Sequence, residues 1–434
     1  MSNKLKEKIL NKRAKIGIIG LGYVGLPLAV IFVKKGFTVY GMDVDKGRLA
    51  KLKKGISYIL DVPSSEIRKA VSGRKFVITD DFARIKKLDA VIICVPTPLY
   101  KTKEPDVSYI VSAVENIKKH MKRGQIIVLE STTYPGTTEE VMLPVLESTG
   151  LKEGKDFYLA FSPERIDPGN KKFDTGNTPK VIGGISKIST ELAKTLYEQV
   201  IDTVVPVSSS KVAEMVKLLE NTFRIVNIGM VNELMLMCDK LGVDVWEVID
   251  AARTKPYGFM PFYPGPGCGG HCIPIDPIYL SWKARMHGFE ARFIDLASQV
   301  NSEMPHYVVS KIIEGLNNHG KPLKRSKVLI VGAAYKKDVK DLRESPALEI
   351  IDQLIKKGAA VSYYDPYLPY LKIHGINLKA LKFNRNAFRD SDCVVIVTDH
   401  SNVDYDFIVK NSDLVIDTRN ILKNIKGRKN IIRL

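Results

Sequence analysis

The sequence predicts an α/β protein in which two doubly wound domains are joined by a central helical region with a long connecting helix. Short apolar runs alternate with helix-length segments in both halves of the chain, which is typical of parallel sheets covered by helices on both faces. One long helical pattern separates the two halves, and 434 residues are enough for two to three domains. We therefore expect an N-terminal domain, a central region that carries the long helix and a C-terminal domain, at residues 1–205, 206–305 and 306–434.

Five strands are expected in the N-terminal half. Each is a short apolar run separated from the next by a helix-length segment, and the runs lie at residues 15–20, 37–43, 89–95, 125–130 and 157–160. The first run, "KIGIIG", ends in glycine and is followed by a helical pattern from Val24 to Lys35. This alternation predicts a parallel sheet.

The connecting helix is expected from about Ser208 to Leu241. At about 1.5 Å per residue it would be roughly 50 Å long, which is more than one small domain needs. We therefore expect it to connect the domains and to take part in a homodimer or higher assembly. Apolar residues recur along it at steps of three and four, at Val212, Val216, Leu219, Phe223, Val226 and Met230.

The alternation of strands and helices resumes after Lys321. The two halves are alike in pattern, but they share no internal sequence repeat. Apolar runs predict four strands of the C-terminal domain, at residues 327–332, 359–365, 392–398 and 413–417.

The charge balance excludes some classes of function. Lys and Arg number 66 against 48 Asp and Glu, which gives a net charge of +18 and could serve nucleic acid, a membrane surface or an anionic small substrate. The basic residues are scattered, however, and do not interleave with aromatic residues on one face, so we expect no nucleic-acid partner. No apolar run approaches the roughly 18–20 residues that cross a bilayer, and the charged N-terminus has no hydrophobic signal core. A cytoplasmic location without membrane contact is expected.

The odd number of five cysteines, without a framework of spacings, argues against a secreted protein built on disulfides. Cys94, Cys238 and Cys393 lie in apolar segments and are expected to be small buried hydrophobic residues. Cys268 and Cys272 lie in "YPGPGCGGHCIPIDP" at residues 263–277. A pair spaced C-x3-C with one histidine offers too few ligands for structural zinc, so no metal is expected.

The stretch "GLGYVG" predicts a dinucleotide site in a Rossmann-like domain, because it follows a strand and opens a helix. Gly20 permits the tight turn, Gly22 lets a pyrophosphate approach the backbone, and Gly25 allows close helix packing. The helix N-terminus stabilises the phosphate charge. Asp43 ends the next strand, where it would accept hydrogen bonds from a ribose 2′-OH and repel a 2′-phosphate, which favours NAD. The alternative is a glycine turn in an α/β fold without a ligand.

Cys272 is the candidate nucleophile. The stretch "DPIYLSWKARMHG" predicts a helix with Asp276 as its N-cap and Pro277 in its first turn. Cys272 therefore lies just before a helix N-terminus, where a thiolate is stabilised. Gly269 and Gly270 are expected to let substrate approach closely. The alternative for Asp276 is a purely structural cap.

Lys217 and Asn221 lie four residues apart on the long helix, so they share one face. Such a pair can hold an alkoxide or a thiohemiacetal oxyanion. Taken alone, however, two polar residues on a helix are more often at the surface.

The chain resembles the UDP-glucose/GDP-mannose dehydrogenase family over residues 14–425. The motifs that carry the resemblance occur in the family's order: "GLGYVGLPLA", "VPTP", "STTYPGTT", "FSPERIDPG", "KLLENTFR", "GGHCIPIDP" and "YKKDVKDLRESPA". The branch that oxidises UDP-N-acetylhexosamines is the most similar, given "KPYGFMPFYPGPGCGGHCIPIDPIYLSWKA" and "SPERIDPGN".

The resemblance implies a four-electron oxidation that uses two NAD per turnover. The sugar C6 alcohol becomes a carboxylate through an aldehyde and a cysteine thioester. Cys272 would be the nucleophile, Asp276 would act as base or orient water, and Lys217 and Asn221 would hold the oxyanion. Glu164 and Thr133 would position the substrate and the hydrolytic water. The product implies a role in the synthesis of polysaccharide or glycan precursors.

The resemblance also implies two sets of binding residues. Tyr335 and Lys336 match the family's aromatic–lysine pair that binds uridine diphosphate. The cofactor side adds Tyr23, Val24, Arg48, Thr97, Thr133 and Arg343 to the glycines and Asp43. The substrate side comprises Glu164, Arg165, Lys217, Asn221, Tyr263, Gly269, Tyr335, Lys336 and Arg419.

Other readings of the sequence predict different chemistry. UDP-glucose enzymes of the family commonly have lysine before the loop aspartate, where this chain has Ile275, so UDP-glucose is an alternative substrate. Several relatives place an arginine from the neighbouring subunit before the loop, where this chain has Gly258. A two-electron β-hydroxyacid dehydrogenase is a further alternative, but that class lacks the cysteine loop and the second nucleotide-like domain.

Overall fold

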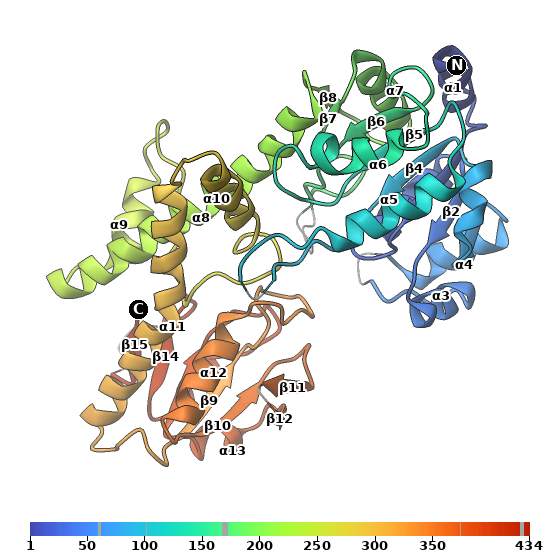
Figure 1. Ribbon diagram of the computed structural model, residues 1–434. Helices are drawn as coiled ribbons and strands as arrows, with labels where there is room; N and C mark the ends of the chain where they lie inside the picture. The colour runs from blue at the N-terminus through green and yellow to red at the C-terminus, as the bar shows by residue number, and fades with distance from the viewer. Residues whose placement is uncertain (60–61, 101, 167–171, 374, 426–428) are drawn as a thin grey trace. The chain divides into compact units, whose positions relative to one another are not determined.

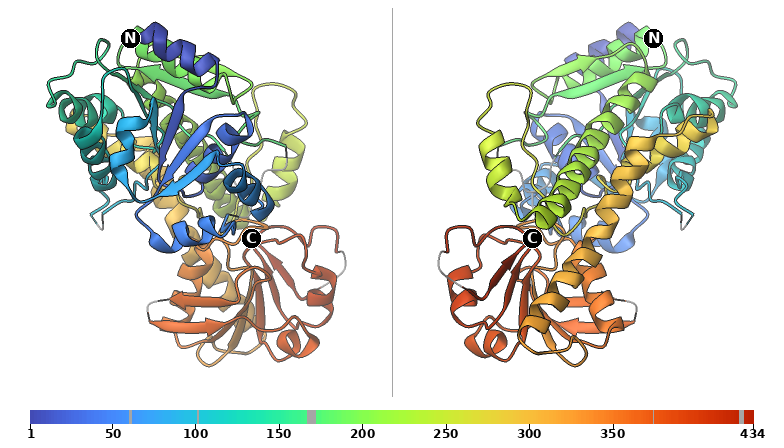
Figure 2. Two further views of the ribbon diagram at one scale, coloured as in Figure 1. Left: turned by 90° about the vertical axis from the view of Figure 1, so that its right-hand side faces the viewer. Right: turned by 90° about the vertical axis from the view of Figure 1, so that its left-hand side faces the viewer.

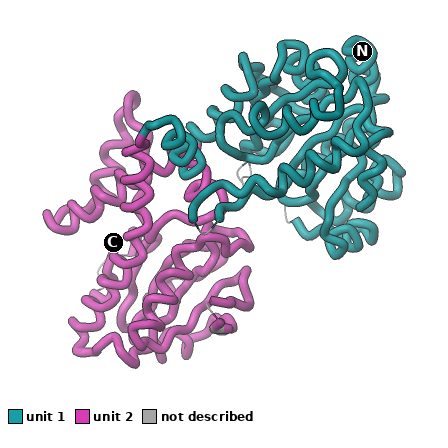
Figure 3. Tube along the Cα trace, viewed as in Figure 1, with its two compact units in different colours: residues 1–220, 278–289 teal, residues 221–277, 290–434 magenta. Residues whose placement is uncertain are grey.

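The computed structural model describes residues 1–59, 62–100, 102–166, 172–373, 375–425 and 429–434 (Figure 1). The chain divides into two compact units, coloured separately in Figure 3. The first unit comprises residues 1–220 and 278–289, and the second comprises residues 221–277 and 290–434. Helix α8 (Ser210–Leu241) begins in the first unit and ends in the second. The division into three domains at residues 205 and 305 stays a prediction.

The first unit is built on an eight-stranded sheet with the order β3-β2-β1-β4-β5-β6-β7-β8. Neighbouring strands run parallel except β6 and β7, which are antiparallel. All five strands expected from the sequence are present, and β3, β7 and β8 are additional. The strands are β1 (Lys15–Ile19), β2 (Thr38–Met42), β3 (Phe76–Thr79), β4 (Ala90–Ile93), β5 (Ile126–Leu129), β6 (Tyr158–Phe161), β7 (Lys180–Gly184) and β8 (Val204–Pro206).

Helices cover both faces of this sheet. Along β4, Ala90 and Ile92 join one hydrophobic cluster while Val91 and Ile93 join the other, because successive side chains of a strand point to opposite faces. A strand buried on both faces reads as a continuous apolar run. One face is covered by α1 (Ser2–Leu10), α2 (Gly25–Lys34), α3 (Lys46–Lys53), α4 (Ser64–Ser72) and α7 (Lys187–Tyr197). The other is covered by η1 (Phe82–Lys87), α5 (Ser108–His120), η2 (Thr138–Met142) and α6 (Leu143–Glu147).

The second unit contains a five-stranded parallel sheet with the order β10-β9-β13-β14-β15, seen with α11 and α12 in Figures 1 and 2. The four expected strands are β9 (Lys327–Val331), β10 (Ala360–Tyr364), β13 (Cys393–Ile396) and β14 (Val415–Asp417), and β15 (Ile431–Arg433) is additional. A hairpin of β11 (Tyr370–Ile373) and β12 (Ile376–Lys379) lies outside the sheet. The helices are α9 (Val245–Ala252), α11 (Arg292–Asn318), α12 (Pro346–Lys356), α13 (Arg385–Arg389) and α14 (Tyr405–Lys410). The predicted fold class of two doubly wound domains with a long connecting helix is confirmed.

The two long helices bury different kinds of face. The helix α11 was not predicted, although it buries an apolar stripe at helical spacing that includes Ile294, Met304 and Leu316. The helix α8 is present as expected, with 32 residues. It exposes several large apolar side chains, namely Val212, Met215, Leu219, Phe223, Met230, Leu234, Met237 and Leu241. Within the described residues, no helix is long and apolar enough to cross a membrane.

The turn between β1 and α2 uses its three glycines in two different ways. Gly20 has φ +93°, and a Cβ there would lie 2.4 Å from the carbonyl oxygen of Cys94. A Cβ on Gly25 would lie 1.9 Å from the carbonyl oxygen of Gly20, so both positions exclude any side chain for reasons of packing. Nothing lies within 4 Å of a Cβ built on Gly22. Gly22 is therefore open to a ligand, as the approach of a pyrophosphate requires.

Two alanine substitutions separate these roles. Gly25→Ala should lower the free energy of unfolding by about 1–3 kcal/mol, because the new methyl group meets backbone that cannot move aside. Gly22→Ala should leave the unfolding free energy within about 0.5 kcal/mol of the unchanged chain, as is usual for a surface change. It should nevertheless weaken NAD binding by about tenfold or more. Chemical denaturation and calorimetric titration with NAD measure the two effects. Undiminished NAD binding by Gly22→Ala would contradict the assignment of this turn.

Candidate active site

Asp43 lies at the end of β2, beside the glycine turn, and is 5% exposed. Its carboxylate accepts hydrogen bonds from the backbone N–H groups of Leu21 and Asp45, each at 2.9 Å. Arg48 on α3 places Nη1 3.5 Å from Oδ2 of Asp43. These contacts fix a carboxylate next to the open face of Gly22, which fits the ribose and pyrophosphate of a dinucleotide. Tyr23 and Val24, also expected on the cofactor side, lie in the turn itself.

The helix α10 (Asp276–Met286) follows the loop that carries Cys272, and its residues from 278 onward belong to the first unit (Figure 3). The buried hydroxyl of Tyr279 donates a hydrogen bond to the carbonyl of Thr97, in the "VPTP" stretch. Lys283 pairs with Glu140 at 2.6 Å. These contacts fasten the helix to the loop after β4 and to η2. Tyr279 was not predicted, because an aromatic residue on a short helix carries no signal for such a contact.

Thr133 lies in the loop after β5 and is 1% exposed. Its Oγ1 is 2.8 Å from Oγ1 of Thr137. The buried Glu214 of α8 holds the same loop by accepting from the backbone N–H of Gly136 at 2.5 Å and of Thr138 at 2.9 Å, and from Oγ1 of Thr138 at 2.6 Å. Burial raises the pKa of Glu214, although the hydrogen bonds from Thr138 and Gly136 oppose this. The sequence analysis missed Glu214, whose spacing of three residues from Lys217 was an available signal.

Lys217 and Asn221 are 8% and 4% exposed, so the surface reading of this pair is wrong. Asn221 donates from Nδ2 to the carboxylate of Asp276 at 2.5 Å. Asp276 is 2% exposed and is the first residue of α10. The helix therefore begins one residue earlier than expected, and Asp276 lies inside it rather than at the N-cap position. Its carboxylate binds a side chain of another helix, so its role is more than a local cap.

The two loop cysteines differ in accessibility. Cys272 is exposed, and its carbonyl oxygen accepts from the N–H groups of Ile275 at 3.2 Å and Asp276 at 2.8 Å, which places it immediately before α10. Cys268 is half-buried, and burial raises the pKa of its thiol to about 12, although Arg419 and Arg224 act in the opposite direction. A thiol with so high a pKa stays protonated near neutral pH and is a poor nucleophile. Of the other cysteines, Cys94 and Cys393 are buried as expected, while Cys238 is only half-buried.

Gly269 and Gly270 make room for protein in the structure, and the expectation that they let substrate approach stays a prediction. A Cβ on Gly270, where φ is +90°, would lie 2.8 Å from Cε2 of Tyr335. A Cβ on Gly269 would lie 2.7 Å from Cβ of Tyr335. The N–H of Gly270 donates to the carbonyl of Arg343 at 2.9 Å. The cysteine loop therefore packs directly on the loop between β9 and α12, which contains Tyr335, Lys336 and Arg343.

Buried polar contacts fix the start of the cysteine loop within the second unit. The N–H of Gly265 donates to Oδ1 of Asn232 at 2.9 Å, and Nδ2 of Asn232 donates to Oδ1 of Asn301 at 2.8 Å. These two asparagines link the loop to α8 and α11. Arg419 lies against the same glycine, because a Cβ on Gly265 would come within 2.7 Å of its Nη1. Tyr263 stacks on Trp246 with ring centroids 5.9 Å apart.

The loop after β9 contains a residue in a left-handed conformation. Asp338 has φ 59°, which is uncommon for a residue other than glycine. Its N–H donates to Nδ1 of the buried His400 at 3.0 Å, and its carboxylate accepts from Ser401 N at 2.8 Å and Ser401 Oγ at 2.6 Å. Because Nδ1 of His400 is an acceptor here, Nε2 carries the proton, and it lies 3.1 Å from Asp365. His400 thus holds the loop that contains Tyr335 and Lys336, although the sequence did not reveal it.

Glu164 follows β6, and both of its carboxylate oxygens have contacts. Oε1 accepts from the N–H groups of Arg165 at 2.7 Å and Ile166 at 2.8 Å, and Oε2 lies 3.5 Å from Nζ of Lys180. Arg165 pairs with Glu220 at 2.5 Å, so its guanidinium is held against α8. The rest of the "FSPERIDPGN" motif, residues 167–170, lies outside the described residues.

The predicted site residues are divided between the two units. The first unit contains Gly20, Gly22, Tyr23, Val24, Gly25, Asp43, Arg48, Thr97, Thr133, Glu164, Arg165 and Lys217. The second contains Asn221, Tyr263, Gly269, Cys272, Asp276, Tyr335, Lys336, Arg343 and Arg419. Arg343 pairs with Asp341 at 2.6 Å, and its reach to the cofactor stays a prediction. In the described part of the chain, no three His, Cys, Asp or Glu side chains gather to hold a metal ion.

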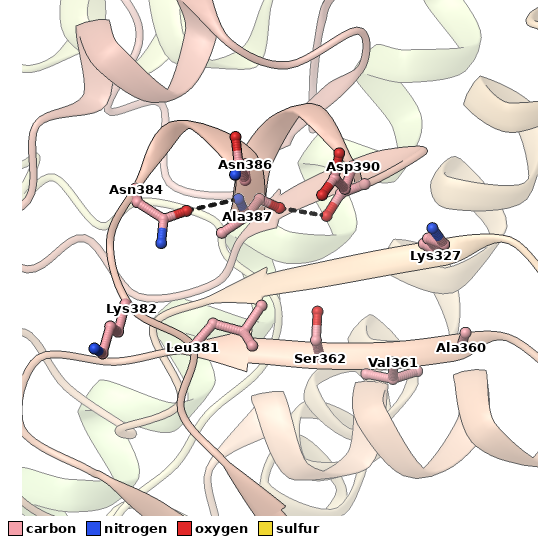
Figure 4. Close-up of a pocket in the computed structure, with 11 residues that line it drawn as sticks. Lys327, Ala360, Val361, Ser362, Leu381, Lys382, Asn384, Asn386, Ala387 and Asp390 are labelled. Atoms are coloured by element: carbon pink, nitrogen blue, oxygen red, sulfur yellow. Dashed lines mark hydrogen bonds between the residues drawn. The ribbon is translucent and has the colours of Figure 1, made fainter.

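A pocket of about 470 Å³ lies in the second unit beside β10 and α13 (Figure 4). Its lining includes Lys327, Ser362, Asn384 and Asp390. Lys327 and Ala360 begin their strands, whereas Tyr335 follows the other end of β9. None of the predicted site residues lines this pocket, so it is not part of the candidate site.

Substitution of His400 tests the support of the loop after β9. His400→Phe removes the acceptor for the N–H of Asp338, and an unpaired buried N–H costs about 1–3 kcal/mol. Uridine diphosphate should therefore bind about tenfold more weakly, while NAD binding, which depends on the first unit, should not change. His319→Phe is the matched control, because the ring of this histidine bonds to the carbonyl of Gly315 in α11, the helix that it caps, away from the loop after β9. Equal affinity of the two variants for uridine diphosphate, measured by calorimetry, would refute the role of His400.

Comparisons with known proteins agree with the geometry. Residues 14–201 match the NAD binding domain of the UDP-glucose/GDP-mannose dehydrogenase family, residues 211–303 its central domain and residues 329–424 its UDP binding domain. The chain is 39% identical to a UDP-N-acetyl-D-glucosamine 6-dehydrogenase of Pseudomonas aeruginosa over 82% of this chain and 84% of the relative. It is 36% identical to a UDP-N-acetyl-D-mannosamine dehydrogenase of Methanococcus vannielii over 99% and 97%. A solved UDP-D-ManNAc dehydrogenase structure from Pyrococcus horikoshii superposes with a TM-score of 0.88 at 34% identity, covering 96% of this chain and 98% of the other. The chain therefore belongs to the UDP-glucose/GDP-mannose dehydrogenase family.

Proposed function

We propose that this protein is an NAD-dependent 6-dehydrogenase of a UDP-N-acetylhexosamine, UDP-N-acetylglucosamine or UDP-N-acetylmannosamine, and that it oxidises the sugar C6 hydroxyl to a carboxylate. The observation that carries the proposal is the environment of Cys272. Its thiol side chain is exposed immediately before α10, four residues from an aspartate that is hydrogen-bonded to Asn221. A two-electron dehydrogenase needs no such cysteine, whereas oxidation beyond the aldehyde needs a covalent adduct.

The cofactor side is supplied by the first unit. NAD, when bound, is the oxidant in both oxidation steps. The turn at Gly20–Gly25 provides an open backbone and a helix N-terminus for the pyrophosphate. Asp43 provides acceptors for a ribose hydroxyl, and its negative charge disfavours a 2′-phosphate.

Different side chains of the protein have different roles in the oxidation of the sugar. The sulfur of Cys272 forms a bond to the C6 carbon of the aldehyde, and the ammonium of Lys217 and the amide of Asn221 donate to the oxygen that becomes negative. Asp276 orients Asn221 by accepting one of its amide hydrogens. Oxidation of this adduct gives a thioester. Water then attacks the thioester carbon, the C–S bond breaks, and the sulfur leaves as a thiolate while the carboxylate and two protons are released.

The identity of the sugar is proposed from the relatives and from one residue. The relatives named above act on UDP-N-acetylglucosamine or UDP-N-acetylmannosamine. Ile275 occupies the position before Asp276 where UDP-glucose enzymes commonly have lysine. UDP-glucose and a two-electron oxidation remain the alternatives that the experiment below separates.

The deciding experiment counts NADH released per sugar consumed. Each of the three UDP-sugars is supplied in limiting amount, and NADH is followed by absorbance until the reaction ends. Two NADH per UDP-N-acetylhexosamine are expected from the unchanged protein, and the four-electron product should be absent with Cys272→Ala. Cys268→Ala is the matched control and should keep the same stoichiometry. One NADH per sugar, or a Cys272→Ala variant that still releases two, would refute the thioester route.

We also propose that the protein is a homodimer whose subunits meet along α8. A helix that exposes eight large apolar side chains over its length is poorly suited to remain in water. The length of α8 and the regular spacing of these residues suit a self-complementary contact with the same helix of a second copy. This contact would bury Leu219, Phe223, Met230 and Met237.

Charge placed on this face should separate the subunits. Met230→Glu combined with Met237→Glu should convert a species of twice the chain mass into a monomer, because an interface excludes unpaired charges. Lys240→Glu, a charge change at an exposed polar position of the same helix, should leave the dimer intact. Light scattering during size-exclusion chromatography measures the mass. A monomeric unchanged protein, or a dimer that survives both glutamates, would show that α8 is not the interface.

A further inference from the structure

A buried lysine lies where the sheet of the first unit reverses direction. Lys180 begins β7 and is 4% exposed. Its ammonium is 3.2 Å from Oε2 of Glu130, at the end of β5, and 3.5 Å from Oε2 of Glu164. It also lies 5.2 Å from the ring centre of Tyr197, whose hydroxyl donates to the other oxygen of Glu130. One cation is therefore shared by two carboxylates.

The strand pairing explains why these groups meet. The strands β6 and β7 are antiparallel, and Phe161 pairs with Gly183. Continuing this register for three residues places Glu164 opposite Lys180. Ser162 ties the extension together, because its Oγ donates to the carbonyl of Val181 at 2.9 Å. Opposite charges directly across such a pair attract one another.

The two carboxylates that share the ammonium of Lys180 differ in their exposure to solvent. Burial raises the pKa of Glu130, in spite of the neighbouring lysine. Burial lowers the pKa of Lys180, but Glu130 and Glu164 outweigh it and raise the pKa overall. Glu130 is 1% exposed, whereas the side chain of Glu164 is 14% exposed. The buried pair of Lys180 and Glu130, the inner pair, is thus structural. The carboxylate of Glu164 is the one that can meet water or substrate.

Glu164 is fixed by donors on both of its oxygens. The N–H groups of Arg165 and Ile166 donate to Oε1, and the ammonium of Lys180 attracts Oε2. The backbone contacts hold one oxygen near the chain but leave the carboxylate plane free to turn. Lys180 restricts that rotation, because among the described residues its ammonium is the cation that lies beside the second oxygen.

We propose that Lys180 is a positioning residue that holds Glu164 in place for hydrolysis of the Cys272 thioester. The inference rests on the proposed function and on the role in placing water that the family resemblance implies for Glu164. In that step the water oxygen bonds to the thioester carbon, the C–S bond breaks, the sulfur leaves as thiolate, and two protons are released as the carboxylate forms. No oxidant is consumed in it. Loss of Lys180 should therefore slow hydrolysis and leave the two preceding oxidations intact.

A double substitution separates the positioning of Glu164 by Lys180 from the effect of Lys180 on the stability of the fold. Lys180→Met alone leaves a buried, unpaired Glu130 and is expected to fold poorly. Lys180→Met with Glu130→Gln removes both charges of the inner pair and changes only the support of Glu164. Glu130→Gln alone keeps Lys180 beside Glu164 and shows what the loss of the inner carboxylate does by itself. Lys180→Arg keeps the cation and should restore hydrolysis in part. Lys8→Met, which breaks the 2.6 Å pair with Asp89 elsewhere in the unit, is the matched control.

The measurement is the amount of sugar bound covalently to the chain during turnover. Each variant is mixed with saturating NAD and UDP-N-acetylglucosamine or UDP-N-acetylmannosamine, quenched in acid and weighed by intact-protein mass spectrometry. The double variant should accumulate the adduct and lose about tenfold or more in kcat. Its KM for the UDP-sugar should change less than its kcat, because the backbone contacts of Glu164 Oε1 remain in place. Glu130→Gln and Lys8→Met should show little adduct.

The outcomes separate the two proposals. If the unchanged protein does not release two NADH per sugar, the proposed function fails and this inference fails with it. If it does, and the double variant turns over at the unchanged rate, only the role of Lys180 is overturned. Slower turnover without adduct also overturns it, because the defect would then lie before the thioester.

Discussion

The burial of a polar stripe on α8 is the constraint on which the candidate site depends. Glu214, Lys217 and Asn221 lie at spacings of three and four residues, so they share one face of the helix, and each is less than a tenth exposed. Buried polar groups are costly unless they are hydrogen-bonded. Glu214 therefore binds the loop that contains Thr133, and Asn221 binds the aspartate that begins α10. The helix fixes two loops of the candidate site through the hydrogen bonds that its own burial demands.

The opposite side of α8 is also unusual, because it exposes large apolar side chains. Leu219, Phe223 and Met230 were taken from the sequence as the regular apolar face of the helix, and such a face normally packs into the core. In the structure these three residues are exposed, while polar residues are buried. The periodicity of the apolar residues correctly predicted a helix, but it did not indicate which side of the helix is buried. A helix that buries polar residues among apolar ones on one side and exposes apolar residues on the other is suited to support a site on the first side and to meet another chain on the second.

The sequence predicted those features whose parts lie close together along the chain. The glycine turn and Asp43 belong to one strand–helix–strand unit, and Cys272 and Asp276 belong to one loop, so local patterns were sufficient. Glu214, Lys180 and His400 were missed because their partners lie far away in sequence. A lysine before an apolar strand looks like any surface lysine until the order and direction of the strands are known. The antiparallel step between β6 and β7 is what no local pattern revealed.

The glycines of the cysteine loop have a packing role that the sequence did not predict. Gly269 and Gly270 were expected to leave space for a ligand, yet the atoms that approach them belong to Tyr335 and to the backbone of Glu344. The N–H of Gly270 also binds the carbonyl of Arg343. The two loops of the second unit therefore pack directly on one another. Tyr335 is thus held by the glycines, while Asp338, in the same loop, is held by His400 from the opposite side.

The group around Lys180 follows from the energetics of buried charge. A buried ion pair is seldom more stable than apolar residues of the same volume, because desolvation of both charges opposes their attraction. A lysine with a single carboxylate partner inside this sheet would therefore add little to stability. A lysine with a second, partly exposed carboxylate partner fixes the direction of that charged group at the end of a strand. An apolar residue cannot do this. Glu130, which accepts a hydrogen bond from Tyr197, then holds the ammonium of Lys180 beside the carboxylate of Glu164.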